Sequence, residues 1–82
     1  MSKIIEYPVI MTKHSKGNFS VSSPNIPGMK AKGKIILQAY LHAIKSAETV
    51  LEGKTAPKVF SIRDWKLEDN QKIFFIPVLV KS

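Results

Sequence analysis

The sequence predicts a small α+β domain with the element order β-β-β-α-β and one helix packed on one face of the sheet. Three observations lead to this prediction. The N-terminal third has apolar residues in strand-like patterns, separated by turns that contain glycine or proline. Residues 34–52 repeat apolar positions every three or four residues, which is typical of a helix. Residues 72–81 form a final apolar stretch of strand length.

The first two strands are expected to form a hairpin. The first is predicted over residues 4–13, and both of its faces carry apolar side chains. The polar segment 14–18 contains a glycine and predicts the turn. The second strand, residues 18–23, alternates apolar residues with serines, so one of its faces is expected to be wet.

A rigid turn is expected to separate the second strand from a third. Residues 24–28 contain two prolines and a glycine, which fix or permit the backbone angles of a turn. Residues 29–32 then predict a short strand with Lys30 and Lys32 on its outer face.

The only predicted helix lies between two glycines. Gly33 is expected to open it, because glycine is an acceptable N-cap. Gly53 is expected to follow its end, where glycine is strongly favoured. The connection 54–71 contains five large apolar residues and is expected to pack against the domain.

The last strand, residues 72–81, is apolar on both faces. Pro77 lies inside it and cannot donate a ladder hydrogen bond, which favours a sheet edge. Short turns make the first three strands antiparallel, and the helical crossover is expected to return the last strand parallel to the first. The predicted sheet order is 3-2-1-4, within a single domain that spans residues 1–82.

Composition narrows the classes of function. The chain has 82 residues and no cysteine, which excludes disulfides and thiolate metal sites and suits a reducing cytosol. The N-terminus does not resemble a signal peptide, and the apolar run 73–80 is too short to span a bilayer as a helix. We therefore expect a cytoplasmic protein with no membrane partner.

The titratable residues do not predict an enzyme. The six acidic residues are scattered over the predicted elements and do not converge as a two-metal nuclease requires. His14 and His42 lie on different elements without a nucleophile elbow or a pair of zinc-ligand spacing. We expect no catalytic residue, no metal site and no cofactor.

Positive charge is the clearest polar feature. Thirteen Lys and Arg residues against six acids give a net charge of +7. Candidate partner or nucleic-acid contacts are Trp65 and the lysines near the predicted turns: Lys13, Lys16, Lys30, Lys32 and Lys34. The alternatives are that these lysines serve solubility and edge protection, and that Trp65 is a lid over the core.

Several segments together resemble HicB-type antitoxins. Tyr7-Pro8-Val9-Ile10 is similar to the first strand of that family, and Phe19-Ser20-Val21 to the second. The corner Pro24-Asn25-Ile26-Pro27-Gly28 is similar to the family's Pro-Asp-Leu-Pro-Gly and is the most specific match. The alanines of the helix and the closing Ile76-Pro77-Val78 extend the resemblance over nearly the whole chain.

This resemblance implies a partial RNase H-like fold and a role as an antitoxin. HicB-type antitoxins neutralise small HicA-type mRNA-cleaving toxins by covering them, usually as oligomers. The chain ends soon after the last predicted strand, so we expect a HicB-like domain without the family's C-terminal DNA-binding segment. Two departures stand out: Asn25 replaces an aspartate, and the chain is basic where the family tends to be acidic. The alternatives are a small basic nucleic-acid-binding regulator and an orphan domain with another partner.

A homodimer is also predicted. One helix covers one face of a sheet, so the second apolar face of the first and last strands must meet the long connection or another chain. We expect a dimer through this face or through the edge of the last strand. The residues assigned to the interface are Phe74, Ile76, Val78 and Val80.

Overall fold

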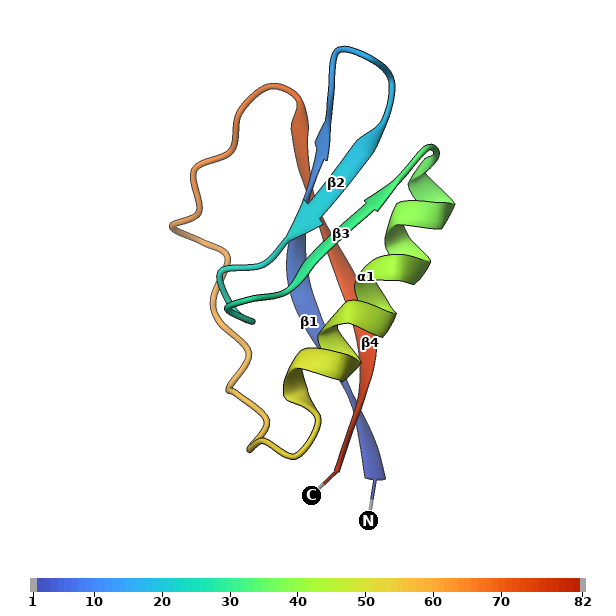
Figure 1. The fold of residues 1–82 in the computed structure, drawn as a ribbon. Coiled ribbons are helices and arrows are strands. Elements are labelled where there is room, and N and C mark those ends of the chain that lie inside the picture. Colours follow the sequence, from blue (N-terminus) through green and yellow to red (C-terminus); the bar gives the residue numbers. More distant parts are fainter. Residues whose placement is uncertain (1, 82) are drawn as a thin grey trace.

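The computed structural model describes residues 2–81, whose path is shown in Figure 1. Within them lie four strands and one helix: β1 (Ser2–Lys13), β2 (Phe19–Ser22), β3 (Lys30–Gly33), α1 (Ile36–Leu51) and β4 (Gln71–Lys81). The strands form one sheet of order β3-β2-β1-β4. The predicted α+β class, element order and strand order are confirmed, as is the edge position of β4.

Strand β4 runs antiparallel to β1, so the prediction of a parallel return was wrong. Helix α1 runs in the direction opposite to β3 (Figure 1). The connection 52–70 then returns along the length of the molecule to the end where β4 begins. This second reversal leaves β4 antiparallel. The sequence prediction counted only the reversal made by the helix.

The sheet has an inner face, which α1 covers, and an outer face. In β1 the odd-numbered residues point inward, and in β4 the even-numbered ones do, because Tyr7 pairs with Ile76. The core consists of inner-face and corner residues packed on the helix alanines: Tyr7, Val9, Met11, Val21, Ile26, Met29, Ala39, Ala43, Ala47, Ile76, Val78 and Val80. Burying a large aliphatic side chain fully stabilises the fold by about 1.5–3 kcal/mol.

Helix α1 begins two residues later than predicted. Gly33 is the last residue of β3, and Ile35, with extended dihedral angles, is the N-cap. A Cβ atom on Gly33 would lie 2.4 Å from the backbone nitrogen of Ala39. Glycine is therefore required by the close approach of β3 to α1 and not by helix capping. Gly53 does follow the helix with φ of 73°, as predicted.

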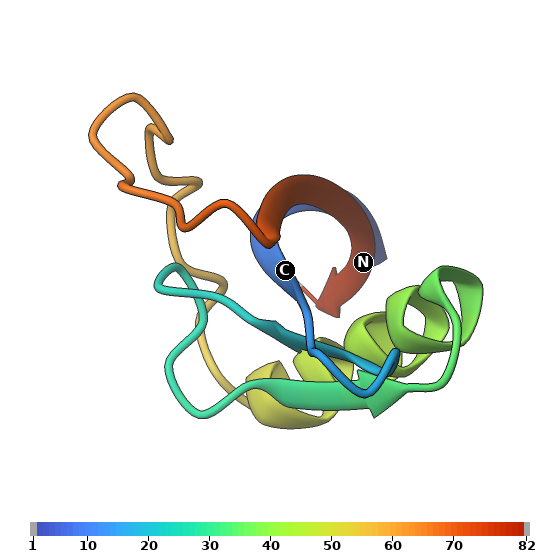
Figure 2. The same ribbon diagram turned by 90° about the horizontal axis from the view of Figure 1, so that it is seen from above.

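The sheet curls, and α1 lies across its open side against both edge strands, β3 and β4 (Figure 2). On the β3 side, Nδ1 of His42 donates a hydrogen bond of 2.7 Å to the carbonyl oxygen of Lys32. The backbone N–H of Lys30 donates to the hydroxyl of Ser46 at 3.3 Å. Two helix side chains thus occupy backbone groups that an edge strand leaves open.

The turn between β2 and β3 is joined to the connection by a buried amide. Asn25, 1% exposed, donates from Nδ2 to the carbonyl oxygen of Lys58 at 2.8 Å. Its Oδ1 accepts from the N–H of Phe60 at 2.6 Å. An aspartate could accept but, when ionised, could not donate, so these two bonds account for asparagine at this corner.

Candidate binding surfaces

The four residues assigned to an oligomer interface lie on the inner face of β4. Ile76 and Val78 are fully buried, Val80 is 6% exposed, and Phe74 is partly buried against the core. The helix covers them, so they form no free surface of the monomer. The sequence could not separate the covered residues from the exposed ones, because apolar residues occupy both faces of this strand, and an interface on β4 stays a prediction.

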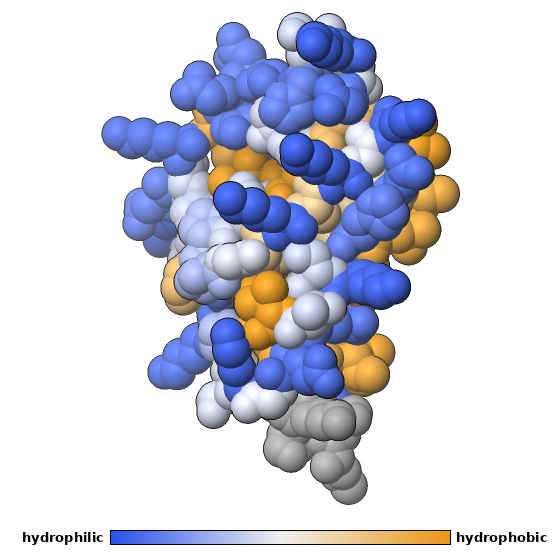
Figure 3. Space-filling view, viewed as in Figure 1, coloured by the Kyte–Doolittle hydropathy of each residue, from blue (hydrophilic) through white to orange (hydrophobic). Residues whose placement is uncertain are grey.

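The exposed apolar residues of the β1–β4 pair lie on the outer face. Ile4 and Leu79 are directly opposite each other and are 66% and 53% exposed. Phe75, opposite the buried Pro8, is 46% exposed. Leu37 and Leu41 are exposed on α1, and their spacing puts them on the same flank as Tyr40 and Glu48, which bond to β4. Apolar residues gather at the α1 margin in Figure 3. We call Ile4, Leu37, Leu41, Phe75 and Leu79 the apolar surface.

The free edge of β4 is blunted where it borders this surface. Glu48 accepts a hydrogen bond of 3.1 Å from the N–H of Leu79, and the hydroxyl of Tyr40 approaches the carbonyl oxygen of Phe75 at 3.5 Å. Backbone groups two residues apart in a strand point the same way, so the nitrogen of Pro77 also faces outward. The missing N–H therefore costs the sheet no hydrogen bond, and strand addition at this edge is opposed.

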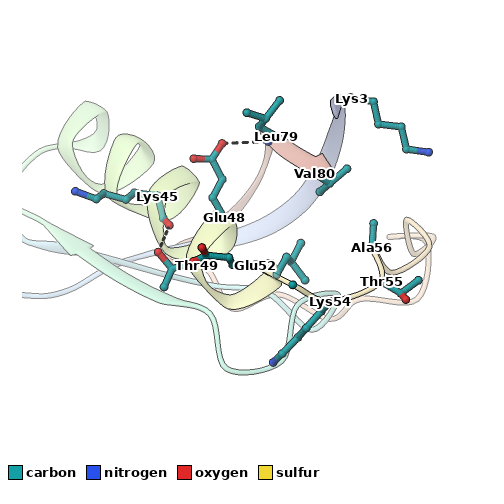
Figure 4. A pocket seen from close by; sticks show the side chains of 12 residues that line it. Lys3, Lys45, Glu48, Thr49, Glu52, Lys54, Thr55, Ala56, Leu79 and Val80 are labelled. Atoms are coloured by element: carbon teal, nitrogen blue, oxygen red, sulfur yellow. Dashed lines mark hydrogen bonds between the residues drawn. The ribbon is translucent and has the colours of Figure 1, made fainter. Parts of the chain in front are cut away.

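A hollow of about 800 Å³ opens at the C-terminal end of α1 (Figure 4). Leu51, Ala56 and Val80 contribute apolar walls, and charged side chains of both signs surround them, including Lys3 and Glu52. Every buried polar side-chain atom within residues 3–80 has a hydrogen-bond partner. The hollow therefore contains no buried polar group waiting for a ligand.

The structure divides the five candidate lysines. Lys30 and Lys32 lie together on the outer face of β3, and Lys34 follows on the exposed segment before α1. Lys13 instead lies on the inner side, where it lines a smaller hollow with Met11 and Phe19. Lys16 lies exposed in the hairpin turn between β1 and β2.

The remaining candidate, Trp65, is half-buried in the connection and is not among the residues packed against the core. The connection is less enclosed than predicted, because Val59 and Phe60 are each 47% exposed and Leu67 is 38% exposed. Trp65 is thus available as a partner contact, a role that stays a prediction.

Titratable side chains form no cluster that suggests chemistry. Within residues 2–81, no three His, Asp or Glu side chains are grouped to hold a metal ion. Both histidines make hydrogen bonds within the protein: His42 bonds to the backbone of β3, and Nε2 of His14 lies 2.7 Å from the hydroxyl of Ser20. Burial raises the pKa of Tyr7, whose hydroxyl donates to the carbonyl oxygen of Pro57 at 2.7 Å. In the same range of residues, α1 is neither long nor apolar enough to cross a bilayer.

Sequence reasoning missed three polar residues that organise the fold. Asn25 joins the corner to the connection, while His42 and Glu48 cap opposite edges of the sheet. The corner motif could have marked Asn25 as buried. The two caps had no comparable signal, because their partners are backbone groups of strands that only the tertiary fold brings to the helix.

Comparison with solved structures shows a HicB-type antitoxin fold, as the resemblance implied. One chain of the HicA3 and HicB3 toxin–antitoxin complex matches with a TM-score of 0.68 and 21% identity, over 90% of this chain and 98% of that chain. The Burkholderia pseudomallei antitoxin HicB matches with a TM-score of 0.59 and 20% identity, over 95% of this chain. This chain spans 63% of that antitoxin's length. No family model matches the sequence, and no curated protein matches it.

Proposed function

We propose that this chain acts as a HicB-like antitoxin, binding a small HicA-type toxin and covering it without catalysing a reaction. The observation that carries the proposal is the fold match to a chain of a toxin–antitoxin complex, which covers nearly all of both chains. Because the match covers 90% of this chain, the proposal rests on the arrangement of the whole domain.

The apolar surface is the proposed contact with the toxin. It contains five exposed large apolar residues on three elements, β1, β4 and α1, and protein interfaces commonly bury such residues at their centre. The free edge of β4 is capped by Tyr40 and Glu48, so contact through side chains is favoured over strand addition.

One negative charge lies within this surface, although the chain as a whole is positively charged. The chain carries +7, which would repel a basic toxin at long range. Among residues 3–80, Glu6 is the only charged side chain on the outer face of β1 and β4, and it lies exposed between the Ile4–Leu79 and Pro8–Phe75 pairs. A Lys or Arg of the toxin placed against Glu6 would offset the repulsion locally.

Co-expression with the small reading frame adjacent to the gene tests the proposal. The adjacent product alone is expected to arrest growth, and this chain to restore growth and co-purify with it. Leu79→Glu is expected to weaken the complex at least about 30-fold, as for a central interface residue. Val59→Glu is the control, since Val59 is comparably exposed but lies in the connection. Growth arrest that the parent chain does not relieve would contradict an antitoxin role.

Homodimerisation through the apolar surface is a second proposal, and a dimer formed there would compete with the toxin for the same residues. Light scattering at micromolar concentration is expected to give a dimer mass for the parent chain and a monomer mass for Leu79→Glu. A monomer mass for the parent would end the dimer hypothesis but would leave toxin binding intact.

A further inference from the structure

The charges of this chain are divided along the sequence. From Tyr7 to Ala47 there is no Asp or Glu, and the six acids are Glu6 and five residues from Glu48 onward. The same acid-free segment contains both histidines and six lysines: Lys13, Lys16, Lys30, Lys32, Lys34 and Lys45. It includes most of β1, all of β2 and β3, and most of α1. Strands β3 and β2 form one side of the sheet, and their lysines have no carboxylate nearby in sequence.

On this side, lysines and hydroxyls share the outer face of two paired strands. Ser20 is directly opposite Lys32, and Ser22 is opposite Lys30. Thr12 of β1 continues the row beyond Ser20. Alternate residues of a strand are roughly 6.6 Å apart, so the two ammonium groups project side by side. We call Ser20, Ser22, Lys30 and Lys32 the basic surface; hydrophilic side chains cover β2 and β3 in Figure 3.

Lysines on an edge strand can prevent pairing with another strand, but β3 does not need them for this purpose. The hydrogen bonds from His42 to Lys32 and from Lys30 to Ser46 already occupy outward backbone groups of β3. These bonds also fix the backbone that carries the two side chains, and the approach of Gly33 to Ala39 locks the end of the strand against α1. The ammonium groups therefore extend from a rigid base, which reduces the entropy lost when they bind a ligand.

The chemistry of the basic surface selects among negatively charged partners. Membrane-surface binding uses apolar side chains beside the charges, and protein interfaces bury an apolar centre. The outer faces of β2 and β3 carry only serines and lysines. Lysine and serine side chains are typical contacts of nucleic-acid phosphates, whereas base reading uses Arg forks or stacked aromatic rings. We infer that the basic surface binds the phosphate backbone of nucleic acid without reading sequence.

Fluorescence anisotropy with the purified chain tests this inference without any toxin. The probes are a labelled single-stranded oligouridylate and a labelled mixed-sequence DNA duplex, both longer than the sites of about 4–16 nucleotides that small domains cover. Binding is expected in low salt. If two phosphates are neutralised, affinity should fall roughly tenfold as salt rises from about 50 to about 200 mM.

Charge reversal locates the site. Lys30→Glu/Lys32→Glu is expected to weaken binding at least about tenfold at low salt, and Lys30→Gln/Lys32→Gln to weaken it less, because it removes charge without reversing it. The control Lys54→Glu/Lys66→Glu makes the same charge change at two exposed lysines outside the basic surface and is expected to lose less than about threefold. Circular dichroism and thermal melting establish that each variant folds.

Binding to one probe alone would keep the inference and identify which nucleic acid presents the phosphates. Three results would overturn it: no binding of either probe at low salt, equal losses in the control and the charge-reversed variant, or binding that does not change with salt. Each of these can occur whether or not the chain neutralises a toxin, so the antitoxin proposal stands or falls separately.

Discussion

The outer face of the sheet has two halves of different chemistry, although one helix covers the inner face of both. The β1–β4 half exposes Ile4, Phe75 and Leu79, whereas the β2–β3 half exposes serines and lysines. The inner residues of the two halves are similar, with Val21 on one and Val78 on the other fully or nearly buried. Stability thus constrains the inner face, and the two halves differ on the outer face, where this constraint is absent.

The largest expected change in stability comes from a substitution that forces the helix away from the β2–β3 half. Gly33→Ala places a methyl group against the backbone of Ala39 and is expected to destabilise the fold by about 3 kcal/mol. Lys34→Ala, at the exposed neighbouring residue, should change stability by less than about 0.5 kcal/mol. Urea unfolding measures both. Equal midpoints for Gly33→Ala and the parent would show that β3 and α1 can separate without cost.

The next largest change in stability concerns the two hydrogen bonds of Asn25. They join the β2–β3 turn to the connection that leads into β4. Asn25→Asp removes the donor to Lys58 and buries a charge, so a loss of about 2–3 kcal/mol is expected near neutral pH. Because burial raises the pKa of such a carboxyl, the loss should shrink as pH falls toward the ordinary aspartate pKa of about 4 and be smallest below it, where the protonated aspartate can donate. Thermal melts at both pH values test this. A loss independent of pH would contradict the donor argument.

Two neighbouring residues of β4 allow the stability contributions of the inner and outer faces to be compared. Val78→Ala is expected to cost about 2 kcal/mol because Val78 is fully buried in the core. Leu79→Ala should change the stability of the monomer by less than about 0.5 kcal/mol, at protein concentrations below those at which a dimer forms. Chemical denaturation of the two variants provides the comparison. A larger loss for Leu79→Ala would mean that the outer face is already covered, as in a stable dimer.

The smallest effect belongs to the hydroxyl of Tyr7 on the inner side of β1. Tyr7→Phe removes the bond to Pro57 and is expected to cost about 1 kcal/mol. Because burial raises the pKa of Tyr7, its contribution is complete below the ordinary tyrosine pKa of about 10 and is lost as pH rises through the folded-state pKa. Stability should therefore fall above about pH 10 more steeply in the parent than in Tyr7→Phe, which alkaline unfolding curves can measure.

Much of the architecture could be predicted from local patterns. The alternation of β2, the three- and four-residue spacing of α1 and the edge position of Pro77 each have a local physical cause, and each was confirmed. The direction of β4 could not be predicted in this way, because it depends on the path of the connection. The connection carries no periodic pattern that reveals its direction.

The candidate surfaces show the same division. The sequence by itself determined that β1 and β4 are apolar on both faces and that Lys30 and Lys32 project together, because side chains alternate along a strand. Only the tertiary structure decided which face of β4 is free, that Lys13 lies away from the other lysines, and that His42 and Glu48 cap the two edges. These outcomes depend on where the helix packs, since the face it covers becomes the core and the opposite face stays exposed.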